Sequence, residues 1–276
     1  MGEQQQERVD VKELLEKLSP RDKIYSEIET NKIIDNVIAF WPSGDSTDSS
    51  ILVANLAASI AKKGWNVCII DFKVFYPNIY KLLDCEAVPK GRGLIKLLRS
   101  DRVDHREEIT DTKYKNLFLL SPSPMDLIEE YFDFQFEDID RLLDSVKEMF
   151  DLVLIDVPNI PPLEFCVGAI KQCNVGFCVW SERIDCPQNA QRFLSYIGSL
   201  GISSAKIANV ILNNIQGFEY DKQIITEMGM KYIGEFPQIP AVINYSLEGR
   251  VYSVDSLVID RRYQRSMERL VELLAK

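Results

Sequence analysis

The composition is that of an acidic globular protein with enough apolar residues for a large core. The chain has 276 residues, of which 46% are hydrophobic and 27% are charged, and its formal net charge is −10 at pH 7. This charge disfavours a broad nonspecific DNA-binding face, which needs an excess of Lys and Arg to neutralise phosphates. The length allows one large α/β domain or two small ones.

Signals for export, membrane insertion and zinc binding are missing from the sequence. The start, Met-Gly-Glu-Gln-Gln-Gln, is polar and unlike a secretory leader. No apolar run approaches the ~20 residues that a membrane span needs. The six cysteines form no C-x-x-C pair, and the single histidine, His105, lies in a polar stretch. We therefore expect a cytoplasmic protein with buried, free thiols.

The N-terminal residues 1–31 are predicted to form a polar arm with one short helix. Apolar residues between Val11 and Leu18 recur at helical spacing, and Ser19-Pro20 ends the segment. This helix could dock on the core or on a partner. Residues 32–276 are predicted to form the folded domain.

From residue 37 onward, apolar strands alternate with amphipathic helices. Strands are predicted at 37–40, 66–71, 117–120, 152–156, 175–180, 206–212 and 232–234. Helices are predicted at 49–63, 94–99, 136–149, 187–200, 220–228 and 262–275. This alternation predicts a single α/β domain with a doubly wound, mostly parallel sheet and helices on both faces.

Polar side chains follow three of these strands. Asp71, Asp156 and Asn213 each stand at a strand's carboxyl end, which is where ligands bind in such sheets. We therefore expect them to converge on one polar site. The carboxylates of Asp45, Asp48, Asp71 and Asp156, with Ser49, could alternatively hold a hard cation without any nucleotide. The simpler alternative is that these carboxylates are separately solvated or cap the helix.

The segment after the first strand stands where a phosphate-binding loop should be, between a strand and a helix. Against the pattern G-x-x-x-x-G-K-[ST], the glycines become Pro42 and Thr47, the lysine becomes Asp48, and only Ser49 remains. One contact between opposite charges is worth about 4 kcal/mol at an effective dielectric near 20, so this exchange disfavours tight triphosphate binding. The alternative role of residues 45–48 is to cap the following helix.

From about Ile34 to the C-terminus, the sequence resembles the MinD/ParA group of P-loop ATPases. Residues 150–158 look like the group's Walker B segment, Asn213 and its neighbours look like the adenine-reading segment, and residues 234–242 look like the late loop beside the base. The resemblance implies a nucleotide site made of Ser43, Gly44, Asp45, Ser46, Thr47, Asp48, Ser49, Ser50, Asn213, Pro237 and Ile239. It also implies magnesium ligands at Ser49, Asp71 and Asp156.

Three departures from this group fall where catalysis takes place. Ser43 replaces the lysine that crosses the dimer interface, Asp48 replaces the phosphate-binding lysine, and Lys73 replaces the water-positioning aspartate. Phosphoryl transfer relies almost wholly on positioning and charge stabilisation, so we predict a pseudo-ATPase without catalytic residues. ATP and Mg²⁺ are not required, although Lys73 could support weak binding.

These departures and the segment Leu119 to Pro124 resemble the TadZ/CpaE branch of the group, which positions pilus secretion machinery. They imply a dimeric scaffold or localisation factor, with pilus or secretion proteins as partners. The alternatives are an atypical ATPase that switches between monomer and dimer, and a DNA-partitioning factor, which the acidic charge disfavours.

Two further features bear on partners. The last predicted helix is basic and amphipathic, like a membrane-binding helix, yet Glu268 and Glu272 interrupt its basic face. Packing on the domain is therefore favoured over membrane attachment. Aromatic residues including Phe75 and Tyr76 lie near the rim where dimers of the group meet, and they would mark an interface if they were exposed.

Overall fold

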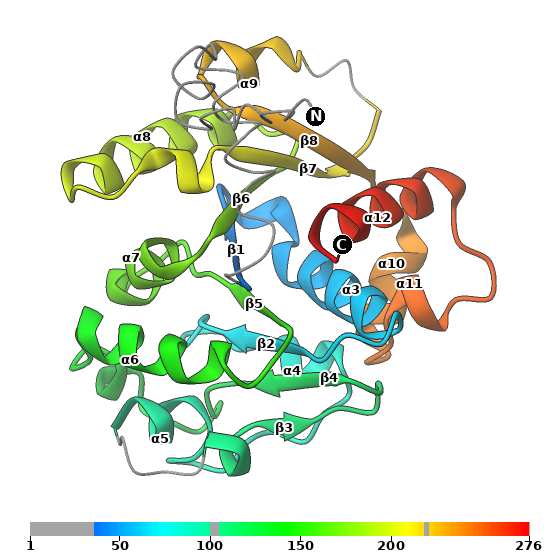
Figure 1. Cartoon of the computed structure of the whole chain (residues 1–276). Helices are drawn as coiled ribbons and strands as arrows, with labels where there is room; N and C mark the ends of the chain where they lie inside the picture. Colours follow the sequence, from blue (N-terminus) through cyan, green and yellow to red (C-terminus); the bar gives the residue numbers. More distant parts are fainter. Residues whose placement is uncertain (1–35, 100–104, 218–220, 276) are drawn as a thin grey trace, which may run out of the picture. The chain divides into compact units, whose positions relative to one another are not determined.

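A single mixed sheet organises the part of the chain that the structure describes. The structure is a computed structural model, and it describes residues 36–99, 105–217 and 221–275, so the predicted arm at 1–31 lies outside the described residues. Within these ranges the eight-stranded sheet has the order β3-β4-β2-β5-β1-β6-β7-β8 (Figure 1). Only β3 is antiparallel to its neighbour. The predicted doubly wound α/β fold is confirmed.

Several strands, such as β1 and β8, extend beyond the residues predicted for them. Their bounds are β1 Val37–Pro42, β2 Val67–Asp71, β3 Thr110–Asp111, β4 Leu117–Leu120, β5 Leu152–Asp156, β6 Val175–Trp180, β7 Asn209–Ile215 and β8 Lys231–Pro237. The two-residue strand β3 is too short to leave a pattern in the sequence. β8 extends beyond its predicted bounds because an edge strand buries fewer residues, so its apolar signal is weak.

Helices cover both faces of the sheet. One face carries α3 Ser49–Ala61, α4 Ile79–Leu82, α10 Pro240–Leu247, α11 Tyr252–Asp255 and α12 Arg261–Leu274. The opposite face carries α5 Leu94–Arg99, α6 Phe136–Lys147, α7 Leu163–Gln172 and α8 Asp185–Ser199 (Figure 1). The short helix α9 Gln223–Glu227 contacts β8, and single 3-10 turns occur at 45–47, 105–108, 128–131 and 204–207.

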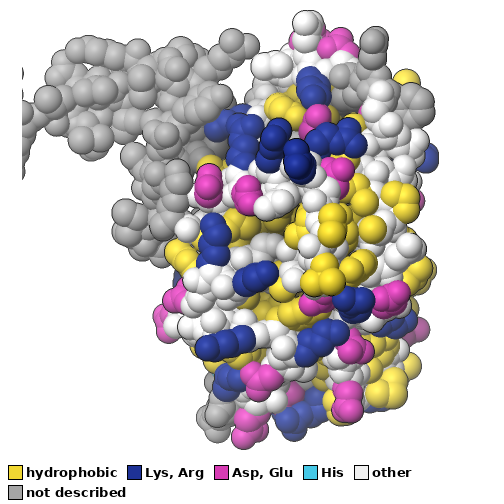
Figure 2. Space-filling model, turned by 90° about the vertical axis from the view of Figure 1, so that its right-hand side faces the viewer, with side chains coloured by type: hydrophobic (Ala, Val, Ile, Leu, Met, Phe, Trp, Pro, Cys, Tyr) yellow, Lys and Arg dark blue, Asp and Glu magenta, His cyan; other side chains and the backbone are white. Residues whose placement is uncertain are grey.

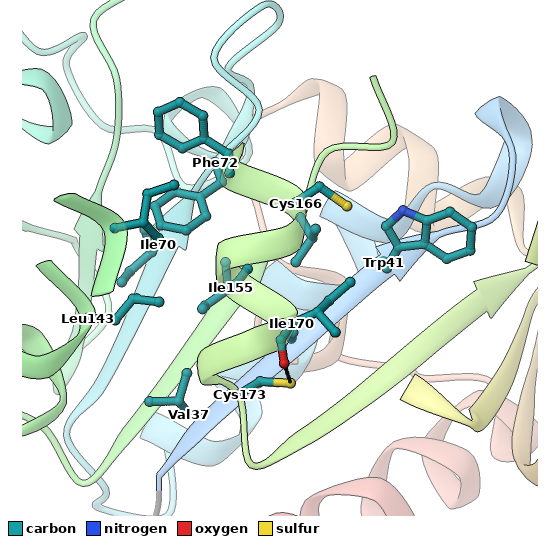
Figure 3. Packing of buried hydrophobic residues seen from close by; sticks show 14 of the residues in the cluster. Val37, Trp41, Ile70, Phe72, Leu143, Ile155, Cys166, Ile170 and Cys173 are labelled. Atoms are coloured by element: carbon teal, nitrogen blue, oxygen red, sulfur yellow. Dashed lines mark hydrogen bonds between the residues drawn. The ribbon is translucent and has the colours of Figure 1, made fainter. Parts of the chain in front are cut away.

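The core consists of one apolar layer on each side of the sheet. Figure 3 shows part of one layer, in which Ile155 of β5 and Ile170 of α7 belong to the same buried cluster. The Cys173 thiol donates a hydrogen bond to the Ile170 carbonyl at 3.3 Å. Cys173 has no disulfide partner, in agreement with the prediction of free thiols. Burial raises the pKa of its thiol to about 12, so it stays protonated and unreactive at neutral pH.

The C-terminal helix α12 packs on the domain through one apolar stripe that includes Tyr263 and Met267. The Asp260 carboxylate caps the helix by accepting bonds from two backbone amides, which lowers its pKa. Figure 2 shows the side of the molecule on which Lys and Arg side chains gather with Asp and Glu between them. Among the described residues, no helix is long and apolar enough to cross a membrane.

Candidate functional site

The loop that follows β1 is held in place by side-chain and backbone bonds to β6 and α8. Both the backbone amide and the hydroxyl of Ser43 donate to the Val179 carbonyl, at 3.0 and 3.1 Å. The Asn189 amide donates to the Ser43 carbonyl at 2.8 Å. The Thr47 hydroxyl closes the turn by donating to the Gly44 carbonyl at 3.1 Å. The loop is therefore fixed by its own chain.

Asp48 is the residue before α3, as the capping alternative predicted, but its carboxylate makes no bond to the helix amides. Its backbone is left-handed, with φ of 48°, and its carboxylate accepts a bond from the side-chain amide of Asn214. The neighbouring Asn213 donates its side-chain amide to the Thr47 carbonyl at 2.8 Å. The residue predicted to read adenine therefore uses its amide group to hold the loop.

The ammonium group of Lys73 lies among the oxygens at the start of α3. It contacts the hydroxyls of Ser49 and Ser50 at 2.8 Å each, and Asp156 Oδ1 also at 2.8 Å. A lysine ammonium has three N–H donors, so these contacts use all of them. The Lys73 side chain is 19% exposed and that of Asp156 is fully buried.

The geometry around Asp156 also tests whether magnesium fits here. Its Oδ2 accepts a bond from the Ser50 hydroxyl at 2.5 Å, and Ser49 lies 3.4 Å from Oδ1. Mg²⁺ would need the oxygens of Ser49 and Asp156 as ligands. Because the Lys73 ammonium already contacts both, the residues present do not fit a divalent ion at this place.

Asp71, the third predicted magnesium ligand, is turned toward its own loop. Its Oδ1 accepts from the Lys73 backbone amide at 3.0 Å, and its Oδ2 accepts from the amides of Asn78 and Ile79 at 3.1 and 3.3 Å. These bonds fix the turn that carries Lys73 toward α3. Burial, together with the nearby charge of Asp156, raises the pKa of Asp71 from 3.8 to about 7.

This raised pKa predicts a pH-dependent stability. Because the folded protein holds a proton that the unfolded chain releases, the free energy of unfolding should decrease as pH rises from about 4 to about 7, by up to about 1.4 kcal/mol per pH unit. Asp71→Asn should remove this slope, which urea unfolding across the pH range measures. An unchanged slope would contradict the assignment, and the exposed Asp133→Asn should leave it unchanged.

A cleft of about 290 Å³ opens beside this cluster. The loop at 42–51 forms one wall, the segment at 73–78 forms another, and residues 158–161 close it. Pro237 does not line this cleft. It lines a separate one of about 710 Å³ together with Leu212 and Glu235, and Ile239 is partly buried against the core.

The structure thus unites most, but not all, of the residues predicted from sequence. The residues from Ser43 to Ser50, with Asp71, Asp156 and Asn213, form one connected region, whereas Pro237 and Ile239 lie apart from its cleft. Sequence analysis missed the roles of Asn189 and Asn214. Asn214 lies next to Asn213 near the carboxyl end of β7, which was a usable signal, but nothing in the sequence pointed to Asn189.

No family model matches the chain. Over 223 residues it is 26% identical to the putative septum site-determining protein MinD of Chlorella vulgaris, which covers 78% of this chain and 76% of that protein. The structure matches MinD of Pyrococcus horikoshii complexed with Mg-ADP, with a TM-score of 0.71 and 19% identity over 88% of this chain and 97% of that one. It also matches the MinC:MinD complex of Aquifex aeolicus, with a TM-score of 0.71 and 18% identity over 87% and 96%. By sequence similarity and by fold, the chain is similar to the MinD/ParA group of P-loop ATPases.

Proposed function

We propose that this chain is a noncatalytic MinD/ParA-like protein that acts as a dimeric scaffold or localisation factor. The observation that carries the proposal is the position of the Lys73 ammonium between Ser49 and Asp156. In a working P-loop site, a serine or threonine hydroxyl and an aspartate at these positions serve magnesium and the nucleotide. Here they serve a cation that belongs to the chain itself.

The charge of the loop supports the same conclusion. Asp45 and Asp48 bring two carboxylates to the place where a phosphate-binding loop offers donors and a lysine. The Lys73 ammonium cannot compensate, because its three donors already contact the protein. A nucleoside triphosphate would therefore meet repulsion, and the described residues that line the cleft offer no free cation to offset it.

The scaffold role rests on the fold and on partner binding by similar proteins. The Aquifex aeolicus MinD structure contains MinC, so this fold can present a surface to another protein. For this chain we propose a homodimer that serves pilus or secretion assembly, as the resemblance to the TadZ/CpaE branch implies. The competing function is an ATPase that changes its oligomeric state with nucleotide.

A calorimetric titration with ATP and Mg²⁺, run beside a phosphate-release assay, decides between the two. We expect no tight binding and no turnover above that of the Asp156→Ala variant. We also expect light scattering to give the same dimer mass with and without ATP. Turnover that Asp156→Ala abolishes, or a dimer that forms only with ATP, would show the switching ATPase instead.

A further inference from the structure

The cleft beside the loop carries the opposite charge to a phosphate site. Its lining includes the carboxylates of Asp45 and Asp48 and one ammonium, that of Lys73. The charge of Lys73 is balanced by the fully buried Asp156. Among the described residues, Asp45 makes no ion pair, and the Asp48 carboxylate accepts a hydrogen bond only from the neutral side-chain amide of Asn214. The accessible part of the cleft is therefore acidic.

Aromatic and aliphatic side chains lie in the lining of the same cleft and beside it. Tyr76 lines it and is 74% exposed, and its ring centroid lies 6.2 Å from that of Phe75. Phe75 in turn lies 6.1 Å from Phe132, which is 50% exposed. Ile160 also lines the cleft and is 36% exposed. Exposed apolar side chains that adjoin one another mark a surface used for binding.

One lining residue of the cleft has a buried side-chain atom without a hydrogen-bond partner among the described residues. The side-chain oxygen of Asn78, a residue of the lining, is buried and accepts no hydrogen bond from any described residue. Buried acceptors are almost always satisfied, so this oxygen calls for a donor. Because the oxygen is almost inaccessible, a ligand would reach it only after the Asn78 side chain turned toward the cleft. A carboxylate or phosphate ligand has no donor to offer it, whereas an ammonium or guanidinium has.

From these three observations we propose that the cleft binds a lysine or arginine side chain of a partner protein, flanked by apolar residues that contact Tyr76 and Phe132. The cation forms charge-assisted hydrogen bonds with Asp45 and Asp48 and lies near the aromatic rings of Phe75 and Tyr76. The exposed aromatic area extends beyond one side chain, which favours a protein segment over a small free amine. The proposal rests on the proposed function, because the cleft must be free of nucleotide phosphates.

The test uses the full chain, labelled with ¹⁵N, and two short peptides as probes. Acetyl-Phe-Lys-Leu-amide at millimolar concentration should shift the amide signals of residues 44–50 and 73–78, and acetyl-Phe-Glu-Leu-amide should not. Combined Asp45→Asn and Asp48→Asn substitutions should weaken the lysine peptide by at least about tenfold, the effect of lost charge-assisted bonds. Asparagine suits the left-handed backbone at position 48, so the variant should fold.

Controls separate this inference from its alternatives. Glu227→Gln combined with Glu272→Gln also removes two negative charges, at exposed sites on α9 and α12, and should leave binding unchanged. Equal shifts from both peptides, or none from the lysine peptide, would overturn the proposal. The proposal would also be overturned if spermidine bound as tightly as the peptide, because the cleft would then be a site for small free amines and not for a protein side chain. If the chain binds the lysine peptide and also turns over ATP, the proposed function is refuted and this inference stands. If the chain neither binds the peptide nor turns over ATP, this inference is refuted and the proposed function stands.

Discussion

Replacing Lys73 by methionine should lower the free energy of unfolding by about 3–5 kcal/mol. Methionine keeps the unbranched shape of the lysine stem but removes the ammonium that contacts Asp156 at 2.8 Å. The fully buried Asp156 carboxylate would then be left without its counter-charge, which is the costly situation for a buried ion pair. Urea unfolding at neutral pH measures the change.

Two further variants and a metal titration make this prediction specific. Adding Asp156→Asn to Lys73→Met should recover part of the loss, because the uncompensated charge is gone. Lys222→Met breaks an exposed pair with Glu235 and should cost less than about 1 kcal/mol. Mg²⁺ should stabilise the Lys73→Met variant and leave the native chain unchanged, since only the variant has Ser49 and Asp156 oxygens free to bind it. Equal stabilisation of both proteins would contradict the position we assign to the ammonium.

Truncating Phe165 to alanine should lower the free energy of unfolding by about 3–5 kcal/mol, the usual cost of removing a buried phenylalanine side chain. Its fully buried ring lies 5.3 Å from Phe72, 5.9 Å from Tyr131 and 6.5 Å from Phe134, measured between centroids. Alanine would leave a cavity where these rings meet. Unfolding in guanidinium chloride, followed by fluorescence and by circular dichroism, measures the loss.

The effect of Phe165→Ala should extend to the cleft, because Phe72 directly precedes Lys73. We expect the lysine peptide to bind more weakly to this variant. For stability alone, Phe132→Ala is the matched control, since half of that side chain is exposed and its removal should cost little stability. It is no control for peptide binding, because Phe132 belongs to the proposed binding surface. If Phe132→Ala proved as destabilising as Phe165→Ala, the placement of the two rings would be wrong.

The three departures from the MinD/ParA motifs act together in space. Ser43 donates to β6 instead of offering a lysine, Asp48 pairs with Asn214, and Lys73 neutralises Asp156. Each replacement is satisfied by a bond within the chain. The polar groups at the carboxyl ends of the strands therefore form a closed network without a ligand, and only the cleft beside them remains acidic and open.

The sequence by itself determined the fold class, the order of the parallel strands and of most of the longer helices, and the place of the candidate site. Helices α7 and α10 were not predicted from it. Apolar strands such as β5, which ends at Asp156, are buried on both faces. They therefore appear in the sequence as continuous apolar runs, which can be recognised without knowledge of the fold. Short elements such as β3 and α11 were not recognised, because two to four residues show no period. That Ser43 and Asp48 stand where the MinD/ParA pattern has lysines could also be read directly from the sequence.

Only the tertiary structure decided what the remaining polar residues do. Three of these roles depend on how the ends of separate strands meet in the fold. Lys73 contacts Asp156, Asn213 holds the loop, and Pro237 lies outside the cleft. A lysine stem is flexible, so its position along the chain does not fix where its ammonium lies. The oxygens of Ser49, Ser50 and Asp156 fix it instead, and they come together only when α3 packs on the sheet.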